Sequence, residues 1–408
     1  MLMSFVGMAV LLGIAYGFSR NRKAISWRTV LGAFGIQFGL GAFVLKVPWG
    51  QALLASMTEG VNQLLSYGDA GIGFLFGGLV AEGIGFTFAL KVLPIIVFFA
   101  SLIAVLYHVG IMKWIIRIIG GGLQRVLGTS RAESMSATAN IFVGQTEAPL
   151  VVKPFIATMT QSELFAVMVG GLASVAGSAL AGYALIGVPV EYLIAACFMS
   201  APGGLMFAKM LMPETEEPQT ELPDVDDEDA PVNVIDAAAN GASSGLYLAL
   251  NVGAMLLAFV ALIAVLNGVL GGIGGWLGMP DLTLELILGW VFSPLAFLLG
   301  VPWNEAVIAG SFIGQKLVVN EFVAYLNFAP YLVEGAAVVL SPKTTAIVSF
   351  ALCGFANLSS IAILLGGLGG MAPSRRKDIA RMGLLAVMAG TMSNLMSGTI
   401  AGLFVAMG

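Results

Sequence analysis

The most informative stretch of the chain is Asn140-Ile141-Phe142-Val143-Gly144-Gln145-Thr146-Glu147-Ala148-Pro149, which is followed at once by the apolar Leu150-Val151-Val152. It places an amide, a hydroxyl, a carboxylate and a proline in otherwise apolar sequence. A charged side chain at the centre of a membrane helix costs about 2.5–3.5 kcal/mol on an insertion scale, so such a residue usually has a function. Glycine and proline beside it predict a helix that breaks at membrane depth, where the freed backbone lines a protein-enclosed cavity. We expect this stretch to form half of a solute-binding site.

The composition indicates an all-α polytopic membrane protein. The chain has 408 residues, of which 58% are hydrophobic and 10% charged, and its mean hydropathy is +0.96. An ordinary soluble domain carries about 25% charged residues. Cys197 and Cys353 lie in apolar runs and predict neither a disulfide framework nor a metal cluster. With His108 as the single histidine, a histidine-based metal site and a catalytic triad are excluded, and no nucleophile–base pair indicates an enzyme.

The net charge of −5 arises from one acidic segment. Residues 214–229 contain nine acidic residues and no basic one, and the remainder of the chain is weakly basic. Nothing in this distribution indicates nucleic-acid binding. We interpret residues 213–240 as a solvated cytoplasmic loop that divides the chain into two halves.

Eight transmembrane helices are predicted, at residues 2–18, 30–47, 92–107, 164–186, 190–211, 246–270, 344–365 and 383–406. The positive-inside rule assigns the basic clusters that follow the first and third of these, and the cluster before the last, to the cytoplasm, so both termini are expected outside. Polar residues alternate with apolar ones from residue 48, which predicts a helix along the membrane interface. We expect an irregular connection at 71–85, a turn at 271–275, and either a span or an interfacial helix at 283–300.

Two further segments are predicted to be re-entrant hairpins. Residues 138–158 are too short between their polar ends for a crossing of about 20 residues. Residues 303–328 are too polar for a crossing, because they contain Asn304, Glu305, Gln315, Lys316, Asn320, Glu321 and Asn327. The predicted topology makes these hairpins enter from opposite faces of the membrane.

The two hairpins belong to a repeat. Phe142-Val143-Gly144-Gln145 recurs as Phe312-Ile313-Gly314-Gln315, and Leu150-Val151-Val152 recurs as Leu317-Val318-Val319. Each hairpin precedes a span interrupted by small and polar residues, at 171–178 and at 354–360. Chance similarity between glycine-rich apolar segments is the alternative, but the shared order of hairpin, interrupted span and plain span argues against it. Inverted repeats with broken helices place substrate and coupling ion near the bilayer midplane.

Three motifs together resemble the concentrative nucleoside transporter family. They are Gly144-Gln145-Thr146-Glu147-Ala148-Pro149-Leu150, Val318-Val319-Asn320-Glu321-Phe322-Val323-Ala324-Tyr325, and Cys353-Gly354-Phe355-Ala356-Asn357-Leu358-Ser359-Ser360. The resemblance covers nearly the whole chain and is strongest from about 130 to 400. It implies a homotrimer in which a mobile domain, holding both hairpins and both broken helices, carries nucleoside across the membrane by an elevator motion.

The resemblance and the repeat together divide the chain into five parts. Residues 1–137 hold N-terminal spans and the interfacial helix, largely scaffold. Residues 138–212 form the first transport repeat, and 213–240 the acidic loop. Residues 241–300 hold the sixth span and an interfacial segment, again largely scaffold. Residues 301–408 form the second transport repeat.

The resemblance also implies site residues. The nucleobase would be bound by Gln145, Thr146 and Glu147, and the ribose by Glu321, Asn357 and Ser360. Phe355 and Leu248 would supply apolar contacts. The co-transported sodium ion would be held by the Asn140 side chain, the Val143 carbonyl, the Ser174 hydroxyl and the Val175 carbonyl.

These assignments agree with the chemistry of the ligands. A nucleoside is uncharged, so it needs directed hydrogen bonds rather than a counter-ion, and amides and carboxylates provide them. Ribose hydroxyls that donate to a carboxylate form charge-assisted bonds. Sodium prefers hard oxygens, which an unwound helix exposes as carbonyls.

Several structural alternatives remain open at this point. Glu147 and Glu321 could join helices by pairing with Lys153 or Lys316. Asn140 could be a helix cap, Phe355 could be core, and the serines could serve helix packing.

The sequence as a whole predicts a sodium-coupled nucleoside symporter, such as a uridine importer, embedded in the lipid of the bacterial inner membrane. Two alternatives are a proton-coupled symporter, in which Glu147 or Glu321 titrates, and a nucleoside-binding channel or receptor.

Overall fold

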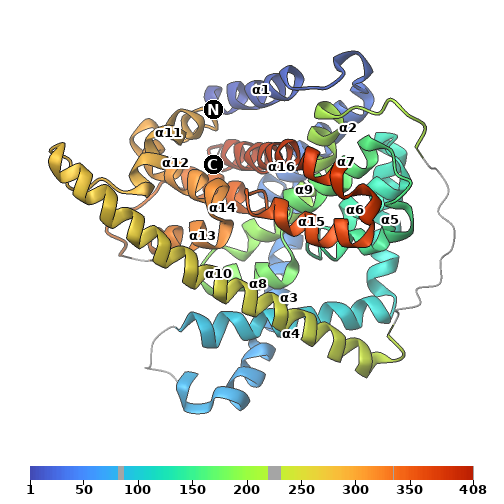
Figure 1. Cartoon of the computed structure of the whole chain (residues 1–408), viewed down its shortest axis with the longest axis horizontal. Coiled ribbons are helices and arrows are strands. Elements are labelled where there is room, and N and C mark those ends of the chain that lie inside the picture. The colour runs from blue at the N-terminus through green and yellow to red at the C-terminus, as the bar shows by residue number, and fades with distance from the viewer. Residues whose placement is uncertain (81–86, 219–230, 334, 408) are drawn as a thin grey trace.

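The computed structural model describes residues 1–80, 87–218, 231–333 and 335–407, and within these ranges the chain forms helices and no strand (Figure 1). The α-helices are α1 (Leu2–Gly17), α2 (Trp27–Lys46), α3 (Pro48–Phe76), α4 (Phe88–His108), α5 (Ile111–Leu127), α6 (Arg131–Ala139), α7 (Gln161–Ala173), α8 (Gly177–Leu185), α9 (Val190–Leu211), α10 (Val234–Trp276), α11 (Leu284–Leu298), α12 (Trp303–Val318), α13 (Glu321–Phe328), α14 (Pro342–Leu352), α15 (Ser360–Met371) and α16 (Arg376–Val405). Short 3₁₀ helices are η1 (Arg22–Ala24), η2 (Gly77–Val80), η3 (Ala148–Phe155), η4 (Ala329–Tyr331) and η5 (Pro373–Arg375). The predicted all-α membrane class is confirmed.

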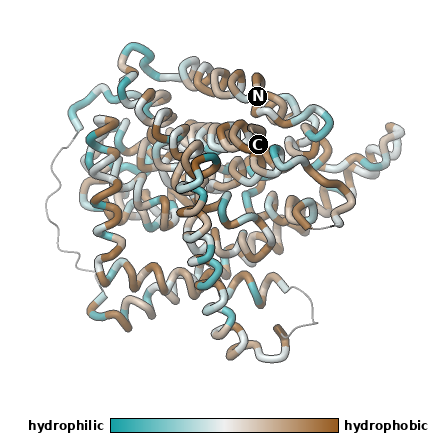
Figure 2. Tube along the Cα trace, turned by 180° about the vertical axis from the view of Figure 1, so that it is seen from behind, coloured by the Kyte–Doolittle hydropathy of each residue, from teal (hydrophilic) through white to brown (hydrophobic). Residues whose placement is uncertain are grey.

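The helices form a buried centre and an exposed periphery. In the most apolar 18-residue window, 94% of residues are buried for the segment Gln161–Leu185 and also for α9, but only 11% for α10. The long α10 crosses α4 on the outside of the molecule (Figure 1). Apolar residues predominate along the outer helices as well as the inner ones (Figure 2). Exposed apolar surface of this extent requires lipid or another protein chain to cover it.

Six helices of the described chain are long and apolar enough to cross a membrane: α2, α4, the α7–α8 segment, α9, α10 and the segment ending in α16. Two of the eight predicted spans are not among these six. The first corresponds to α1, with 16 residues, and the other is divided between α14 and α15. The total of eight crossings therefore stays a prediction.

Two helices are interrupted inside the molecule. Ser174, Val175 and Ala176 separate α7 from α8, and residues 353–359 separate α14 from α15. The first interruption lies within, and the second overlaps, the segments of small and polar residues noted in the sequence. The two breaks lie together, because the backbone N–H of Phe355 donates to the Ser174 carbonyl over 3.1 Å.

The first predicted hairpin contains a helical leg that begins earlier than expected. Helix α6 begins at Arg131, seven residues before the predicted start at 138, because Ser130 and Glu133 form a capping box there. After Asn140 the chain is not helical until η3, in which Pro149 and Pro154 lack the backbone N–H that an α-helix would use.

The second predicted hairpin consists of α12 and α13. The Asn320 side chain caps α13 by accepting from the backbone N–H of Val323 over 2.9 Å. Preceding it, α11 and α12 meet at an angle of 115°.

Three boundaries predicted from the sequence are wrong. The glycines at 271–275 form no turn, because α10 continues to Trp276; Gly274 instead lets the chain fold back closely, since a Cβ there would lie 2.2 Å from the Met279 carbonyl oxygen. Helix α3 continues to Phe76, beyond the irregular connection expected from residue 71. The acidic loop ends earlier than residue 240, because Asn233 caps α10 by accepting from the Asp236 N–H. Residues 81–86 of that connection and 219–230 of the loop lie outside the described residues.

Asn394 of α16 joins the two broken helices. Its Nδ2 donates to the Ala173 carbonyl at the end of α7 over 2.6 Å and to the Cys353 carbonyl beyond α14 over 2.9 Å. Gly354 makes this approach possible, because a Cβ there would lie 2.2 Å from Asn394 Oδ1. One buried amide thus satisfies a carbonyl at each break.

Lys316 of α12 completes the same cluster. Its Nζ donates to Asn394 Oδ1 over 2.6 Å and to the Ala351 carbonyl, in the last turn of α14, over 2.9 Å. The side chain is 2% exposed. The negative end of the α14 dipole stabilises this buried ammonium.

We expect Asn394→Leu to destabilise the protein strongly, because it leaves two backbone carbonyls and the Lys316 ammonium without that partner. Removing one partner of a buried charged group typically costs about 3–5 kcal/mol. Thr399→Val is the matched control, since Thr399 is also buried in α16 but donates only to its own helix, at the Leu395 carbonyl. The apparent melting temperature of detergent-purified protein should fall much further for Asn394→Leu than for Thr399→Val. Equal melting temperatures for the two variants would contradict the role of Asn394.

Candidate functional site

The non-helical residues 140–147 place Gln145 against the second broken helix. Gln145 is buried, and its Nε2 lies 3.5 Å from the Oγ of Ser360, the first residue of α15. Its Oε1 is also buried and accepts no hydrogen bond from the described residues. Thr146 lies beside Gly367 of α15, where a Cβ would be 2.9 Å from Thr146 Cγ2. A buried amide oxygen without a protein partner is costly, which favours a polar ligand as its donor.

Glu321 contributes a buried carboxylate at the first residue of α13. Its Oε2 accepts a hydrogen bond from Asn357 Nδ2 over 3.1 Å. Its Oε1 accepts one from the hydroxyl of Tyr183, on α8, over 3.1 Å. The carboxylate is therefore held by donors from both halves of the chain. Because a carboxylate can accept about four hydrogen bonds, acceptor capacity remains on both oxygens.

Asn357 links Glu321 to the start of α15. Its Oδ1 accepts from the Ser360 backbone N–H over 2.9 Å and from the Ser359 hydroxyl over 2.7 Å. The Ser360 hydroxyl in turn donates to the Phe355 carbonyl over 2.5 Å. This tight turn begins α15 and aligns the polar groups of the second break.

One continuous network therefore contains most of the residues predicted to bind substrate. It runs from Gln145 through Ser360 and Asn357 to Glu321, and its members are buried. Phe355 is half-buried beside it, and Thr146 adjoins it through α15.

Leu248 is not joined to the network by any contact that the described residues record, whereas the Glu147 carboxylate accepts a hydrogen bond from the side chain of Thr146. The Glu147 carboxylate lies over Gly144, where a Cβ would be 2.5 Å from its Oε2, and the residue is exposed. Leu248 is half-buried on α10.

The predicted sodium ligands gather where α6 ends and α7 breaks. Asn140 Nδ2 donates to the Ser136 carbonyl over 2.9 Å, while its Oδ1 is buried and has no hydrogen-bond donor among the described residues. The Ser174 hydroxyl donates to the Asn140 carbonyl and lies 3.5 Å from the Val175 carbonyl oxygen. Val143 follows in the same non-helical segment. The backbone N–H of Gly177, the first residue of α8, donates to the Phe142 carbonyl in this segment over 3.0 Å. Hard, neutral oxygens gathered at an unwound helix suit a sodium ion.

The alternative readings of these residues are partly resolved. Asn140 is indeed the C-cap residue of α6, but capping uses its backbone N–H and its side-chain Nδ2 and does not involve Oδ1. Lys316 donates to a carbonyl and to Asn394, and it forms no ion pair with Glu321 within the described chain.

Sequence reasoning missed Tyr183 and Asn394. Tyr183 lies in apolar sequence 138 residues from Glu321, and Asn394 lies in the last helix. A single tyrosine or asparagine forms no recognisable sequence motif. A polar residue inside an otherwise apolar span was the one available signal.

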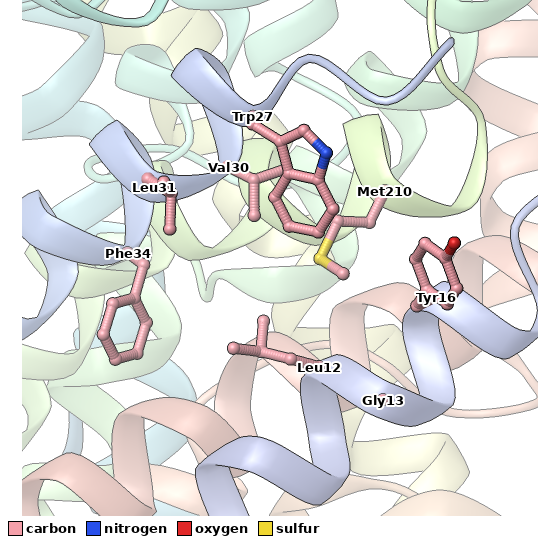
Figure 3. Close-up of a pocket in the computed structure, with 8 residues that line it drawn as sticks. All are labelled: Leu12, Gly13, Tyr16, Trp27, Val30, Leu31, Phe34 and Met210. Carbon is pink, nitrogen blue, oxygen red and sulfur yellow. The ribbon is translucent and has the colours of Figure 1, made fainter. Parts of the chain in front are cut away.

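An apolar pocket lies away from this network. It is formed between α1, α2 and α9 and is lined by Leu12, Gly13, Tyr16, Trp27, Val30, Leu31, Phe34 and Met210 (Figure 3). None of these residues was predicted to bind substrate or sodium.

Three family models match consecutive parts of the chain. Residues 6–79 match the N-terminus and residues 192–402 the C-terminus of the Na⁺-dependent nucleoside transporter, and residues 89–189 match a nucleoside recognition domain.

Individual proteins are similar over the full length. The chain is 57% identical to the nucleoside permease NupC of Helicobacter pylori, covering 99% of this chain and 98% of that protein. It is 39% identical to human solute carrier family 28 member 3, covering 98% of this chain and 60% of that protein. The structure of CNTnw in an inward-facing substrate-bound state is 63% identical, with a TM-score of 0.96, over 100% of this chain and 98% of that chain. An outward-facing variant of CNTnw is 62% identical, with a TM-score of 0.98, over 100% and 99%.

Proposed function

The chain belongs to the sodium-dependent nucleoside transporter family, and on this basis we propose that it imports nucleosides by sodium-coupled symport through the site described above. The observation that carries the proposal is the network from Gln145 of the first half to Glu321 of the second half, with a buried amide oxygen that has no donor among the described residues. Nucleosides are the substrates named for the permease relatives, and their base edges and hydroxyls provide such donors.

The base and the ribose would occupy different parts of this network. Gln145, Thr146 and Glu147 would bind the nucleobase, and Glu321, Asn357 and Ser360 would bind the ribose. Phe355 and Leu248 would provide apolar contact. The exposed position of Glu147 is compatible with a ligand that reaches the site from one side of the membrane.

Sodium would bind at the first break, through Asn140, Val143, Ser174 and Val175. Support comes from Asn140 Oδ1, which has no donor within the part of the chain that the structure describes, and from the Ser174 hydroxyl beside two carbonyl oxygens. One cation that moves down a potential of about 100 mV releases about 2.3 kcal/mol, which corresponds to roughly fifty-fold accumulation of an uncharged substrate.

Movement of the site would follow the division of the chain inferred from the repeat. Residues 138–212 and 301–408 would form the mobile transport domain, because their broken helices are joined by Asn394 and by the Phe355–Ser174 contact. Residues 1–137 and 241–300 would form the scaffold of a homotrimer in the inner membrane, with both termini outside. The exposed apolar surface of α10 suits contact with a neighbouring subunit.

Purified protein in proteoliposomes should accumulate radiolabelled uridine above its external concentration when an inward sodium gradient is imposed. Accumulation should cease when choline replaces sodium at fixed pH and voltage. Uptake that is indifferent to sodium but follows a proton gradient would instead identify a proton symporter. Equilibration without accumulation would indicate a channel.

Glu321→Gln and Glu147→Gln should each reduce uridine uptake by at least a hundredfold, because each loses a charge-assisted acceptor. Hydrogen bonds to charged groups contribute about 1.5–3 kcal/mol, and Glu321 would make more than one to ribose. Glu217→Gln is the control, since Glu217 is exposed and lies outside the site. Full uptake by Glu321→Gln would contradict the assignment of Glu321 to the substrate site.

Ser174→Ala should raise the sodium concentration for half-maximal uptake by about tenfold, equivalent to about 1.4 kcal/mol, because it removes one proposed ligand. Ser200→Ala is the matched control: Ser200 is equally buried and donates within its own helix, to the Cys197 carbonyl over 2.6 Å. The measurement is initial uridine uptake against sodium concentration. Identical sodium curves for the two variants would place the ion elsewhere.

A further inference from the structure

We propose that Tyr183 is a specificity-determining residue that positions the Glu321 carboxylate for the ribose hydroxyls. This inference rests on the proposed function, because it concerns the sugar end of the same site. It adds a residue from the first repeat that none of the sequence motifs contains.

The contact that carries the proposal is a hydrogen bond between the two halves of the chain. The Tyr183 hydroxyl, on α8, donates to Glu321 Oε1 over 3.1 Å. Tyr183 is completely buried and Glu321 is 5% exposed. A buried phenol hydroxyl needs an acceptor, and Glu321 provides it here.

The ring of Tyr183 is fixed by an aromatic cluster on α13. Its centroid lies 4.6 Å from that of Phe322 and 4.7 Å from that of Tyr325. The cluster therefore prevents the hydroxyl from turning away from Glu321.

The geometry fixes the plane of the carboxylate. Asn357 donates to Oε2 and Tyr183 donates to Oε1, each over 3.1 Å, so each oxygen is held once. A carboxylate held at both oxygens cannot rotate about its last bond. Its remaining lone pairs then point in set directions, and two neighbouring hydroxyls of a ribose can meet them together.

Loss of the Tyr183 hydroxyl should therefore weaken sugar discrimination more than it weakens binding in general. A sugar that lacks one hydroxyl leaves an oriented acceptor unpaired, which is the source of discrimination. If Glu321 can rotate, it can adjust to the hydroxyl that is present. Nucleosides with and without the 3′-hydroxyl should then bind more equally.

The test is competition of uridine uptake by unlabelled uridine and by 3′-deoxyuridine in proteoliposomes of the full chain. We expect Tyr183→Phe to lower the inhibition constant of 3′-deoxyuridine divided by that of uridine about tenfold. The ratio does not depend on how much of the variant is folded. If the Tyr183→Phe protein cannot be produced, Tyr183→Met serves the same comparison, because methionine fills the space without a hydrogen-bond donor.

Tyr325→Phe is the matched control. Tyr325 lies in the same aromatic cluster and is completely buried, but its hydroxyl donates to the Ser349 carbonyl over 2.7 Å. Its ratio should equal that of the unmodified protein. An unchanged ratio in Tyr183→Phe, or an equal fall in Tyr325→Phe, would overturn the proposal. Failure of the unmodified protein to take up uridine would instead refute the proposed function, so the two failures are distinguishable.

Discussion

Backbone groups that lose their helical partners inside a membrane must find others, and this requirement organises the structure. Lipid offers no hydrogen bonds, so broken helices are tolerated only where protein or enclosed water satisfies them. Here Asn394 donates to a carbonyl at each break, and the Phe355 N–H donates to the Ser174 carbonyl. The two breaks cannot separate without exposing these groups, so they form one unit.

The same arrangement brings polar side chains together in an apolar protein. Groups near the first break present oxygens without a full set of protein donors, as Asn140 Oδ1 and Gln145 Oε1 illustrate. Groups near the second break are more completely hydrogen-bonded, as Asn357 and Glu321 illustrate. The first region is suited to receive an ion and a base edge, and the second presents a carboxylate already oriented within the protein.

The two repeats differ in the polar groups that they present near their breaks. Near the first break, neutral oxygens from Asn140 and Ser174 suit an exchangeable sodium ion. At the end of α14, the ammonium of Lys316 is covalently part of the chain and donates to the Ala351 carbonyl. The motifs of the two halves are similar, but Lys316 falls where the first repeat has Thr146, so the halves are not chemically equivalent.

Sequence by itself determined the membrane class, the position of both helix breaks, and the motifs from Gln145 to Ser360, because these depend on local composition: charge scarcity, glycine, proline and polar residues in apolar runs. It placed several boundaries wrongly, such as the turn at 271–275 and the start of the first hairpin, because capping by Ser130 and close packing at Gly274 override glycine content. The contacts of Tyr183, Asn394 and Lys316 were decided only by the tertiary structure. Each joins residues of distant segments, and a buried hydrogen bond depends on which helices meet rather than on the residues beside it in sequence.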